Sequence, residues 1–442
     1  MMKKGLYIAE FILILLSASF ATASLTIEEA RNIANQKAQV LLGRSVEWED
    51  ARTLTVDGQP LLLEFVSKEK WSKEEDIPVL DIIIDIRDGH IWKLDFMNPV
   101  KDSEDQGSYI SPEEAKNRVV QIMEELGMPL REDWIIEDAS VSSIGGTEYA
   151  AHICAFQIFN GYEYPSNSLN AELNASTEEL RFLDYTSYPL PLGEEIPQPQ
   201  ITLEEGIQRA ITSLGDLANY QNFIDEASLW LEEWEEVRVP CEKPTLARET
   251  QLIGFVKTPP HIGWGFTIRV TNLPPELSYG SPFPGGTKVI HIDVDAITGD
   301  VLGKAEPPPA IGIPQMPVQK KEDKRNFYIH KISEKPNEIR VLMKEGIAYR
   351  QKPIKCINRK GKIFLLADDL HLLGLKFDKS KFILQVGEKR EKVEKGEIMK
   401  EKGKLYISAR KVADLGEFNL TYNPKFKILK IERDKIEKQG NK

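Results

Sequence analysis

A helix-start pattern recurs three times in this 442-residue chain. In each copy a Ser or Thr is positioned to cap a helix, and a Glu three residues later can bond back to the cap, which is the capping-box arrangement. An apolar residue precedes each cap, as in a hydrophobic staple. The copies begin 85 and 91 residues apart, which predicts a repeated unit. They are Thr26-Ile27-Glu28-Glu29-Ala30, Ser111-Pro112-Glu113-Glu114-Ala115 and Thr202-Leu203-Glu204-Glu205-Gly206.

A second pattern follows each helix start. Asp85-Ile86-Arg87-Asp88-Gly89 aligns with Asp295-Ala296-Ile297-Thr298-Gly299, and Asn174-Ala175-Ser176-Thr177-Glu178 keeps the pattern without the Gly. Asp-Gly or Thr-Gly between alternating apolar residues predicts a hairpin turn. We therefore expect an α+β fold of three helix-on-antiparallel-sheet units, over residues 24–100, 101–193 and 194–306.

Apolar spacing places the individual elements. The first helix is expected from Ile27 to Leu42, and the second should stop at Gly127. Strands are expected from Asp81 to Arg87 and from Tyr149 to Phe159, the latter ending in an Asn160-Gly161 turn. The third unit is longer than the others, and its acidic stretch from Phe223 to Val237 is expected to be helical, with Trp230 and Trp234 on one face.

The N-terminus has the features of a secretory signal peptide over residues 1–23. Lys3 and Lys4 precede an apolar run, and Ala21-Thr22-Ala23 has the small-x-small form of a cleavage site. We expect the mature chain to start near Ser24, to be secreted or associated with the cell envelope, and to carry no transmembrane anchor. N-terminal sequencing of exported protein checks this expectation, and finding Met1 there would contradict it.

Charge divides the chain. From Val318 onward there are 33 Lys and Arg against 18 Asp and Glu, a net of +15, and the upstream part carries a net of −27. All seven Trp are upstream, the last being Trp264. Five prolines between Pro307 and Pro317, followed by Lys320-Lys321-Glu322-Asp323-Lys324, predict a linker over residues 307–326. Residues 327–442 are then expected to form a smaller basic α+β module.

The repeated patterns resemble those of PepSY-type repeats in secreted bacterial proteins, including YpeB-like and YcdB/YcdC-like arrangements. The resemblance covers about Leu25 to Glu306 and includes Phe159-Asn160-Gly161-Tyr162, which is similar to the Asn-Gly strand turn of that family. It implies the α+β units named above. It also implies a role in regulating secreted hydrolases, as protease propeptides do.

The basic module contains a repeat of its own. Gly361-Lys362-Ile363-Phe364-Leu365 matches Gly403-Lys404-Leu405-Tyr406-Ile407, and each copy continues into a helix and a closing strand. The second copy, through Leu415-Gly416, resembles the copper amine oxidase N-terminal-like module of secreted bacterial proteins. That resemblance implies a non-catalytic module, because the copper oxidases bind copper through three His of a separate large domain.

No metal or cofactor is expected. The spacing of the six His fits no shared site, and His371 is expected to be half-buried. The strand-like stretch Asp293 to Asp300 fails the calcium-loop pattern, because Thr298 and Lys304 occupy the positions that need Gly and Glu. Elemental analysis that finds about one copper or zinc per chain would contradict this. The His are His90, His152, His261, His291, His330 and His371.

The sequence gives no catalytic signature. It has no Gly-x-Ser-x-Gly, P-loop or GxGxxG, and its many acidic pairs are best read as solvated surface. Three Cys are too few for a disulfide scaffold, and Cys154, in an apolar strand, is expected to be buried. Trp230 and Trp234 are read as a core face rather than as a sugar-stacking platform.

These observations favour a non-catalytic exported protein that binds other macromolecules at the cell envelope. The expected partner is a protein, such as a secreted hydrolase, while the basic module either holds anionic wall polymer or docks on the acidic units. Nucleic acid is not expected, because no aromatic residues are interleaved with the basic ones to stack on bases. The alternatives are an envelope hydrolase with an unrecognised carboxylate site and a direct protease inhibitor. No binding residues are assigned from the sequence.

Overall fold

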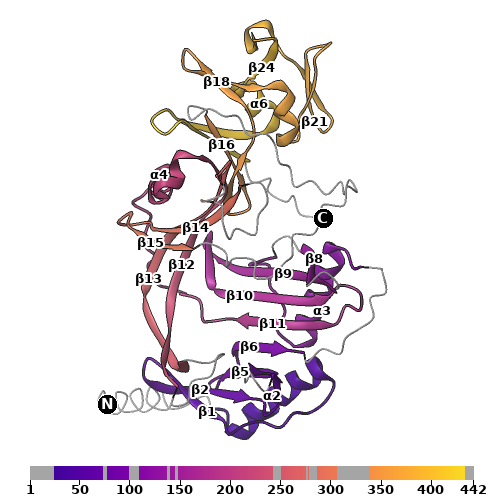
Figure 1. The fold of residues 1–442 in the computed structure, drawn as a ribbon, viewed down its shortest axis with the longest axis vertical. Helices are drawn as coiled ribbons and strands as arrows, with labels where there is room; N and C mark the ends of the chain where they lie inside the picture. The colour runs from indigo at the N-terminus through magenta and orange to yellow at the C-terminus, as the bar shows by residue number, and fades with distance from the viewer. Residues whose placement is uncertain are drawn as a thin grey trace, which may run out of the picture. The chain divides into compact units, whose positions relative to one another are not determined.

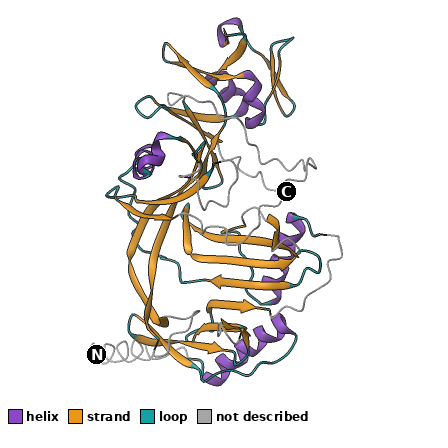
Figure 2. Cartoon of the chain, in the orientation of Figure 1, coloured by secondary structure: helices purple, strands orange, loops and turns teal. Residues whose placement is uncertain are grey.

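The computed structural model describes residues 24–72, 77–98, 109–136, 140–144, 148–241, 250–274, 277, 286–305 and 339–433. The predicted signal peptide and linker lie outside these ranges. The fold is α+β and mostly sheet, as the sequence predicts (Figures 1 and 2). Contacts group Met1–Ile196 with Leu231–His261 into one compact unit, and Pro197–Trp230 with Ile262–Lys442 into another. We call them the N-terminal unit and the C-terminal unit and describe each separately.

The N-terminal unit holds two helices and most of the longer strands. Its elements are α2 (Ile27–Leu42), β1 (Arg52–Val56), β2 (Gln59–Val66), β3 (Lys70–Ser72), β4 (Ile77–Pro78), β5 (Leu80–Asp85), β6 (Ile91–Met97), α3 (Pro112–Glu125), β7 (Trp134–Ile136), β8 (Ser140–Ile144), β9 (Glu148–Phe159), β10 (Tyr162–Asn174) and β11 (Leu180–Thr186). Strands β12 (Gln221–Pro240) and β13 (Thr250–Thr271) belong to this unit over residues 231–240 and 250–261.

One sheet runs through the N-terminal unit. Its antiparallel order is β8–β9–β10–β11–β6–β5–β2–β1, and β13 adds to β1 in parallel, with Thr55 opposite Gly254. The pairing of β6 with β11 joins residues 24–100 to residues 101–193, so the first two predicted units share a sheet.

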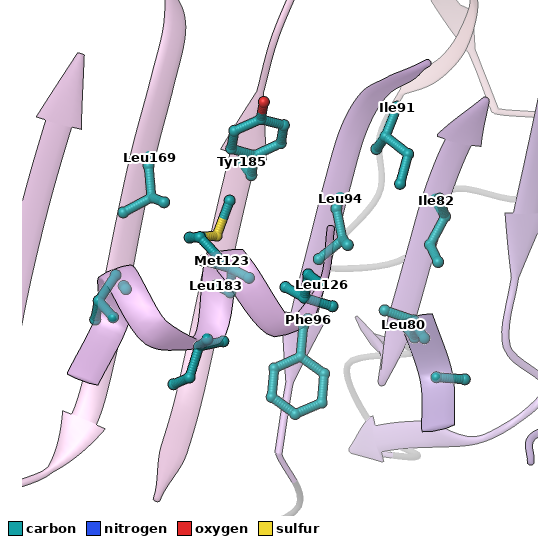
Figure 3. Packing of buried hydrophobic residues seen from close by; sticks show 14 of the residues in the cluster. Leu80, Ile82, Ile91, Leu94, Phe96, Met123, Leu126, Leu169, Leu183 and Tyr185 are labelled. Atoms are coloured by element: carbon teal, nitrogen blue, oxygen red, sulfur yellow. The ribbon is translucent and has the colours of Figure 1, made fainter. Parts of the chain in front are cut away.

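The core of this unit lies between the sheet and both helices (Figure 1). Helix α2 buries only alanines, Ala30, Ala34 and Ala38, which lets its backbone approach the strands closely. Figure 3 shows Met123 and Leu126 among strand side chains that include Leu183 and Phe96. The apolar residues whose spacing predicted the first two helices therefore lie on the buried faces.

The C-terminal unit combines the third helix with the basic module. Its further elements are α4 (Leu203–Ser213), η1 (Gly215–Asn219), β14 (Lys288–Asp295), β15 (Val301–Ala305), β16 (Arg340–Glu345), β17 (Ala348–Lys352), β18 (Cys356–Arg359), β19 (Lys362–Leu366), η2 (Ala367–Leu373), β20 (Lys376–Asp378), β21 (Ile383–Val386), β22 (Lys389–Lys392), η3 (Lys395–Glu397), β23 (Ile398–Glu401), β24 (Lys404–Ser408), α6 (Ala409–Gly416), β25 (Phe418–Asn423) and β26 (Ile428–Arg433).

Two sheets in this unit correspond to the predicted patterns. Strands β13, β14 and β15 pair antiparallel, and α4 contacts β14 and β15. In the basic module β19 and β24, the two copies of the internal repeat, pair with each other through Leu365 and Ile407. The first copy continues into the 3₁₀ helix η2 and the second into the α-helix α6, and a separate core fills the module.

All three predicted capping boxes are present. The side chains of Thr26, Ser111 and Thr202 accept a hydrogen bond from the backbone N–H three residues on, and the Glu there bonds back to the cap. The preceding apolar residue also has the same contact each time, since the N–H groups of Leu25, Ile110 and Ile201 donate to Ile86, Ala175 and Ala296 of the three turns.

We expect Thr202→Ala to lower the free energy of unfolding by about 1 kcal/mol, the usual value of an N-cap. The Thr202 hydroxyl accepts a 3.3 Å bond from the Glu205 N–H, which alanine cannot accept. Urea denaturation measures the change, with Thr202→Ser as the variant that keeps the cap. Equal midpoints for Thr202→Ala and the unaltered chain would contradict it.

The prediction of an acidic helix from Phe223 to Val237 is wrong. This segment lies in strand β12, which runs from Gln221 to Pro240. Residues four apart share a face in a helix and also in a strand, so the spacing of Trp230 and Trp234 did not separate the two structures. The segment is a strand because it has a long partner strand, β13, beside it (Figure 2).

Candidate binding surface and the attachment of the basic module

An acidic row crosses the sheet of the N-terminal unit on the face opposite α2 and α3. Asp81 of β5 lies opposite Asp95 of β6, and Asp95 lies opposite Asp184 of β11. The alternate residues Leu80, Leu94 and Leu183 are buried in the core, so the three Asp share the other face. Neighbouring strands are about 4.8 Å apart, and like charges directly opposite each other destabilise a sheet. Folding alone therefore does not favour this acidic row.

The middle carboxyl of the acidic row is the most perturbed. Burial raises the pKa of Asp95 to about 7, Lys93 opposes that rise, and the hydrogen-bonded neighbour Asp184 adds to it. The Asp95 side chain is still 38% exposed, so water reaches it from one side. This carboxyl therefore holds its proton at a higher pH than an ordinary aspartate does.

One ammonium group serves several of these carboxylates. Lys93 Nζ lies 3.6 Å from Asp95 Oδ2 and 3.8 Å from Glu236 Oε1. Burial lowers the pKa of Lys93, but Asp95, Glu236 and Asp184 together outweigh burial and raise it. Lys93 is therefore held charged, and it shares Glu236 with Arg238, which pairs with Glu236 at 2.6 Å.

We expect Asp95→Asn to stabilise the fold at about pH 8 and to change it little near pH 4. The folded pKa of about 7 lies above the unfolded value of about 3.9, so the folded state binds more protons between them, and stability falls as pH rises through that window. Asn keeps the shape and cannot ionise. Denaturation midpoints at the two pH values test this, with Glu124→Gln on the exposed side of α3 as the control. Parallel pH profiles for Asp95→Asn and the unaltered chain would contradict it.

The same sheet face continues over β10 and β9. Asn170 lies opposite Asp184, and Cys154 lies opposite Asn170. Cys154 is exposed, so its predicted burial is wrong: Ile153 and Ala155 take the core side of β9 and leave Cys154 on the open side. Two residues further along these strands, His152 Nδ1 lies 3.6 Å from Glu172 Oε2. None of Cys154, Cys241 and Cys356 is in a disulfide.

An aromatic cluster attaches Leu231–His261 to this sheet within the N-terminal unit. The Trp92 side chain is fully buried, and its ring centre lies 5.4 Å from Tyr188, 5.2 Å from Trp234 and 5.1 Å from Phe255. The Trp234 indole N–H donates to the Pro189 carbonyl at 3.1 Å. This cluster gives β12 and β13 a structural role beside the acidic row.

The sequence predicts that Trp230 and Trp234 form one core face, but the two side chains have separate environments. Trp234 belongs to the aromatic cluster and is 7% exposed. Trp230 is half-buried against β13, where a Cβ at Gly263 would lie 2.1 Å from its ring, so only glycine fits there. Both rings are used in packing, which leaves no paired platform for a sugar.

The basic module is attached to the start of β12 within the C-terminal unit. Arg340 Nη1 donates to the Asn222 carbonyl and to Gln351 Oε1, both at 3.0 Å, and Nη2 donates to Asn222 Oδ1. Burial lowers the pKa of Arg340 to about 10. A buried cation bound to neutral oxygens requires all of these acceptors to be in place.

Backbone contacts and ion pairs extend this attachment. Ala227 lies opposite Tyr349, which bridges β12 to β17, and the Ile224 N–H donates to Gln351 at 3.0 Å. Arg350 pairs with Glu226 at 3.1 Å, and Lys430 of β26 pairs at 3.1 Å with Glu204 of α4, which is 4% exposed. Basic side chains of the module therefore contact acidic side chains of residues 197–230. We call this set of contacts the module joint.

The outer surface of the module carries mixed charge. Arg359 pairs with Glu401 at 2.8 Å, Lys411 with Glu391 at 2.5 Å, and Lys389 with Glu417. These pairs are solvent-exposed, and such pairs contribute little stability. Acidic neighbours thus match Arg359, Lys411 and Lys389 locally.

Among the described residues, no three His, Cys, Asp or Glu side chains gather closely enough to hold a metal ion. Asp295 Oδ1, in the rejected calcium loop, accepts the Ile297 and Thr298 N–H groups at 2.7 Å each and so serves the turn. His371 is exposed rather than half-buried, with Nδ1 2.8 Å from the Asp368 carbonyl. His330 lies outside the described residues. The absence of a metal stays a prediction.

The described helices include none that is both long enough and apolar enough to cross a membrane.

The chain matches no known family model and no curated protein. Among solved structures it is similar to the Bacillus megaterium YpeB C-terminal domain, with a TM-score of 0.31 and 9% identity over 64% of this chain and 98% of that one. A similarity this low carries no argument about function, so function is argued from the geometry above.

Proposed function

We propose that this chain is an exported, non-catalytic binding protein of the cell envelope that recognises a cationic protein partner through the acidic row. Asp81, Asp95 and Asp184 form the centre of the binding surface, and Asn170, Glu172 and Cys154 extend it over β10 and β9. A secreted hydrolase is the partner class implied by the resemblance of the sequence to PepSY-type repeats.

The acidic row is the observation that carries this proposal. Asp95 and Asp184 lie directly opposite each other, and Lys93 faces them, while Glu236 is paired with both Lys93 and Arg238. A sheet built for stability alone would alternate opposite charges at such positions. A Lys or Arg of a partner would remove the repulsion between these carboxylates, so part of the binding free energy would come from relieving a cost within the protein itself.

The recurring contacts support reading residues 24–305 as three related units. The caps and their bonds to the turns repeat at all three helix starts. In this proposal the first two units form the recognition sheet. The third unit holds the basic module through the module joint, which leaves the outer surface of the module for any contact with anionic wall polymer.

Titration calorimetry with a synthetic peptide that alternates Lys and Thr tests the proposal. We expect binding that weakens between low and physiological salt, because exposed charges are screened over about 8–10 Å. The double variant Asp95→Asn with Asp184→Asn should bind at least about tenfold more weakly, which is about 1.4 kcal/mol. The matched control, Glu124→Gln with Glu132→Gln, makes the same charge change away from the acidic row and should bind as the unaltered chain does. Equal loss in both double variants would show that only net charge matters and would overturn the assignment.

The same residues favour one alternative, an envelope hydrolase. A hydrogen-bonded Asp pair with one pKa near 7 is what acid–base chemistry on a polymer requires. Turnover of a wall polymer or peptide by the unaltered chain, abolished in Asp95→Asn, would support the hydrolase. Saturable binding of the Lys peptide without turnover of either substrate supports the binding protein.

A further inference from the structure

Three hairpins in this chain share one irregularity. In the second strand of each hairpin, the first residue lies directly opposite a residue of the first strand. The second residue has no such partner and is the extra residue of a β-bulge. Ile84 lies opposite Ile91 and Ile83 opposite Lys93, which leaves Trp92 as the extra residue. The register shifts at Arg181 of β11 and at Leu302 of β15 are the same. Strands β6, β11 and β15 are therefore equivalent in their local geometry.

Two of these equivalent strands pair with each other. Strands β6 and β11 run antiparallel, and Asp95 lies opposite Asp184. Each of these two residues is the fifth of its strand, so the pairing is self-complementary about that position. Within the part of the chain that the structure describes, β15 is registered with β14 alone (Figure 1).

The apolar side chains at the bulge of β15 are exposed. Of the bulge residues in the two paired strands, Trp92 is 0% exposed within the aromatic cluster and Arg181 is 8% exposed. The equivalent Leu302 is 47% exposed, and Val301 beside it is 43% exposed. The strand is therefore apolar and exposed at its first two residues, while Lys304 nearer its end is exposed as well. An exposed strand edge with apolar residues is a ready template for another strand.

We propose that β15 pairs antiparallel with β15 of a second copy of this chain, as β6 pairs with β11 within one copy. A centre at Ala305, the fifth residue, would place Pro307 and Pro309 opposite Gly303 and Val301, and proline cannot donate to the ladder. The pairing is therefore centred on Gly303, with Val301 opposite Ala305 of the second copy. It buries Leu302 and Val301 on both copies and forms a closed two-fold contact.

Sedimentation velocity of the full chain over a range of concentrations tests the pairing. The unaltered chain should form dimers, and the variant Val301→Lys with Leu302→Lys should raise the dimer dissociation constant more than about tenfold, since charge on an edge strand opposes pairing. Leu192, which is 77% exposed, provides the control as Leu192→Lys and should leave the dimer unchanged.

A cross-link locates the contact independently of stability. Gly303→Cys, in a chain whose three native Cys are replaced by Ser, should form a disulfide-linked dimer on mild oxidation, because directly opposed residues are about 4.5–5.5 Å apart between Cα atoms. The added Cβ would lie 3.8 Å from the nearest atom, Asp293 Oδ2, which is ordinary contact. Leu192→Cys in the same background is the control. A chain that stays monomeric at every concentration, a dimer unaffected by the edge variant, or equal cross-linking at both sites would each overturn the pairing. Binding of a strand from another protein to a monomeric chain would likewise overturn it.

Discussion

Replacing Arg340 with Ala should release the basic module from residues 197–230. The guanidinium donates to both oxygens of Asn222 and to Gln351, so its loss leaves the two half-buried Asn222 oxygens without this donor, while Gln351 keeps the Ile224 N–H. Each lost bond costs roughly 1 kcal/mol, and we expect a total of about 2–3 kcal/mol. Arg340→Met, which keeps the apolar stem and loses the donors, should behave in the same way.

The distribution of tryptophan makes this release measurable. The basic module has no Trp, so Trp fluorescence follows the upstream part alone, while circular dichroism follows both parts. In urea the two signals should coincide for the unaltered chain and separate for Arg340→Ala. The control is Arg359→Ala, which breaks an exposed pair with Glu401 and should cost under about 1 kcal/mol. Coincident signals with an unchanged midpoint for Arg340→Ala would show that the module joint contributes little.

Trp92→Ala should be the most damaging substitution in the N-terminal unit. It removes a fully buried ring that contacts Tyr188, Trp234 and Phe255, and leaves a cavity where Leu231–His261 packs on the sheet. Truncation of a buried aromatic side chain costs about 3–5 kcal/mol. The urea midpoint measured by circular dichroism gives the change.

Trp92→Phe is the informative comparison. The Trp92 indole N–H is buried and has no hydrogen-bond partner among the described residues, so Phe loses ring area without losing a bond. We expect Phe to cost much less than Ala. Leu192→Ala, at a side chain 77% exposed, should change stability by no more than about 0.5 kcal/mol. Similar losses for Trp92→Ala and Leu192→Ala would mean that the aromatic cluster does not hold the segment.

Local chemistry made the helix starts and turns predictable. A capping box requires only a Ser or Thr and a Glu three residues later, so the sequence around Thr26, Ser111 and Thr202 was enough to predict the three helix starts. The middle turn lacks Gly, yet Glu178 adopts φ +60°, close to the +79° of Gly89. Asn174 Oδ1 supports it by accepting the Ser176 and Thr177 N–H groups.

Long-range pairing was not predictable in the same way. Nothing in the spacing of Asp95 and Asp184 says that their strands are neighbours, although both are the fifth residue of equivalent strands. That shared position is the signal that could have found the acidic row. The module joint likewise depends on Arg340 and Asn222, which are far apart in sequence and of residue types common on surfaces.

A native cysteine on the same sheet face as the acidic row, Cys154, can report whether a ligand binds there. Cys154 is exposed and lies in the same register row as Asn170 and Asp184, whereas Cys241 and Cys356 are half-buried elsewhere. The measurement is the rate of thiol alkylation at each Cys, by mass spectrometry, with and without saturating Lys–Thr peptide. If the acidic row is the binding surface, bound peptide slows the alkylation of Cys154 and leaves that of Cys356 unchanged. An unchanged rate at Cys154 while the peptide is bound would contradict the account.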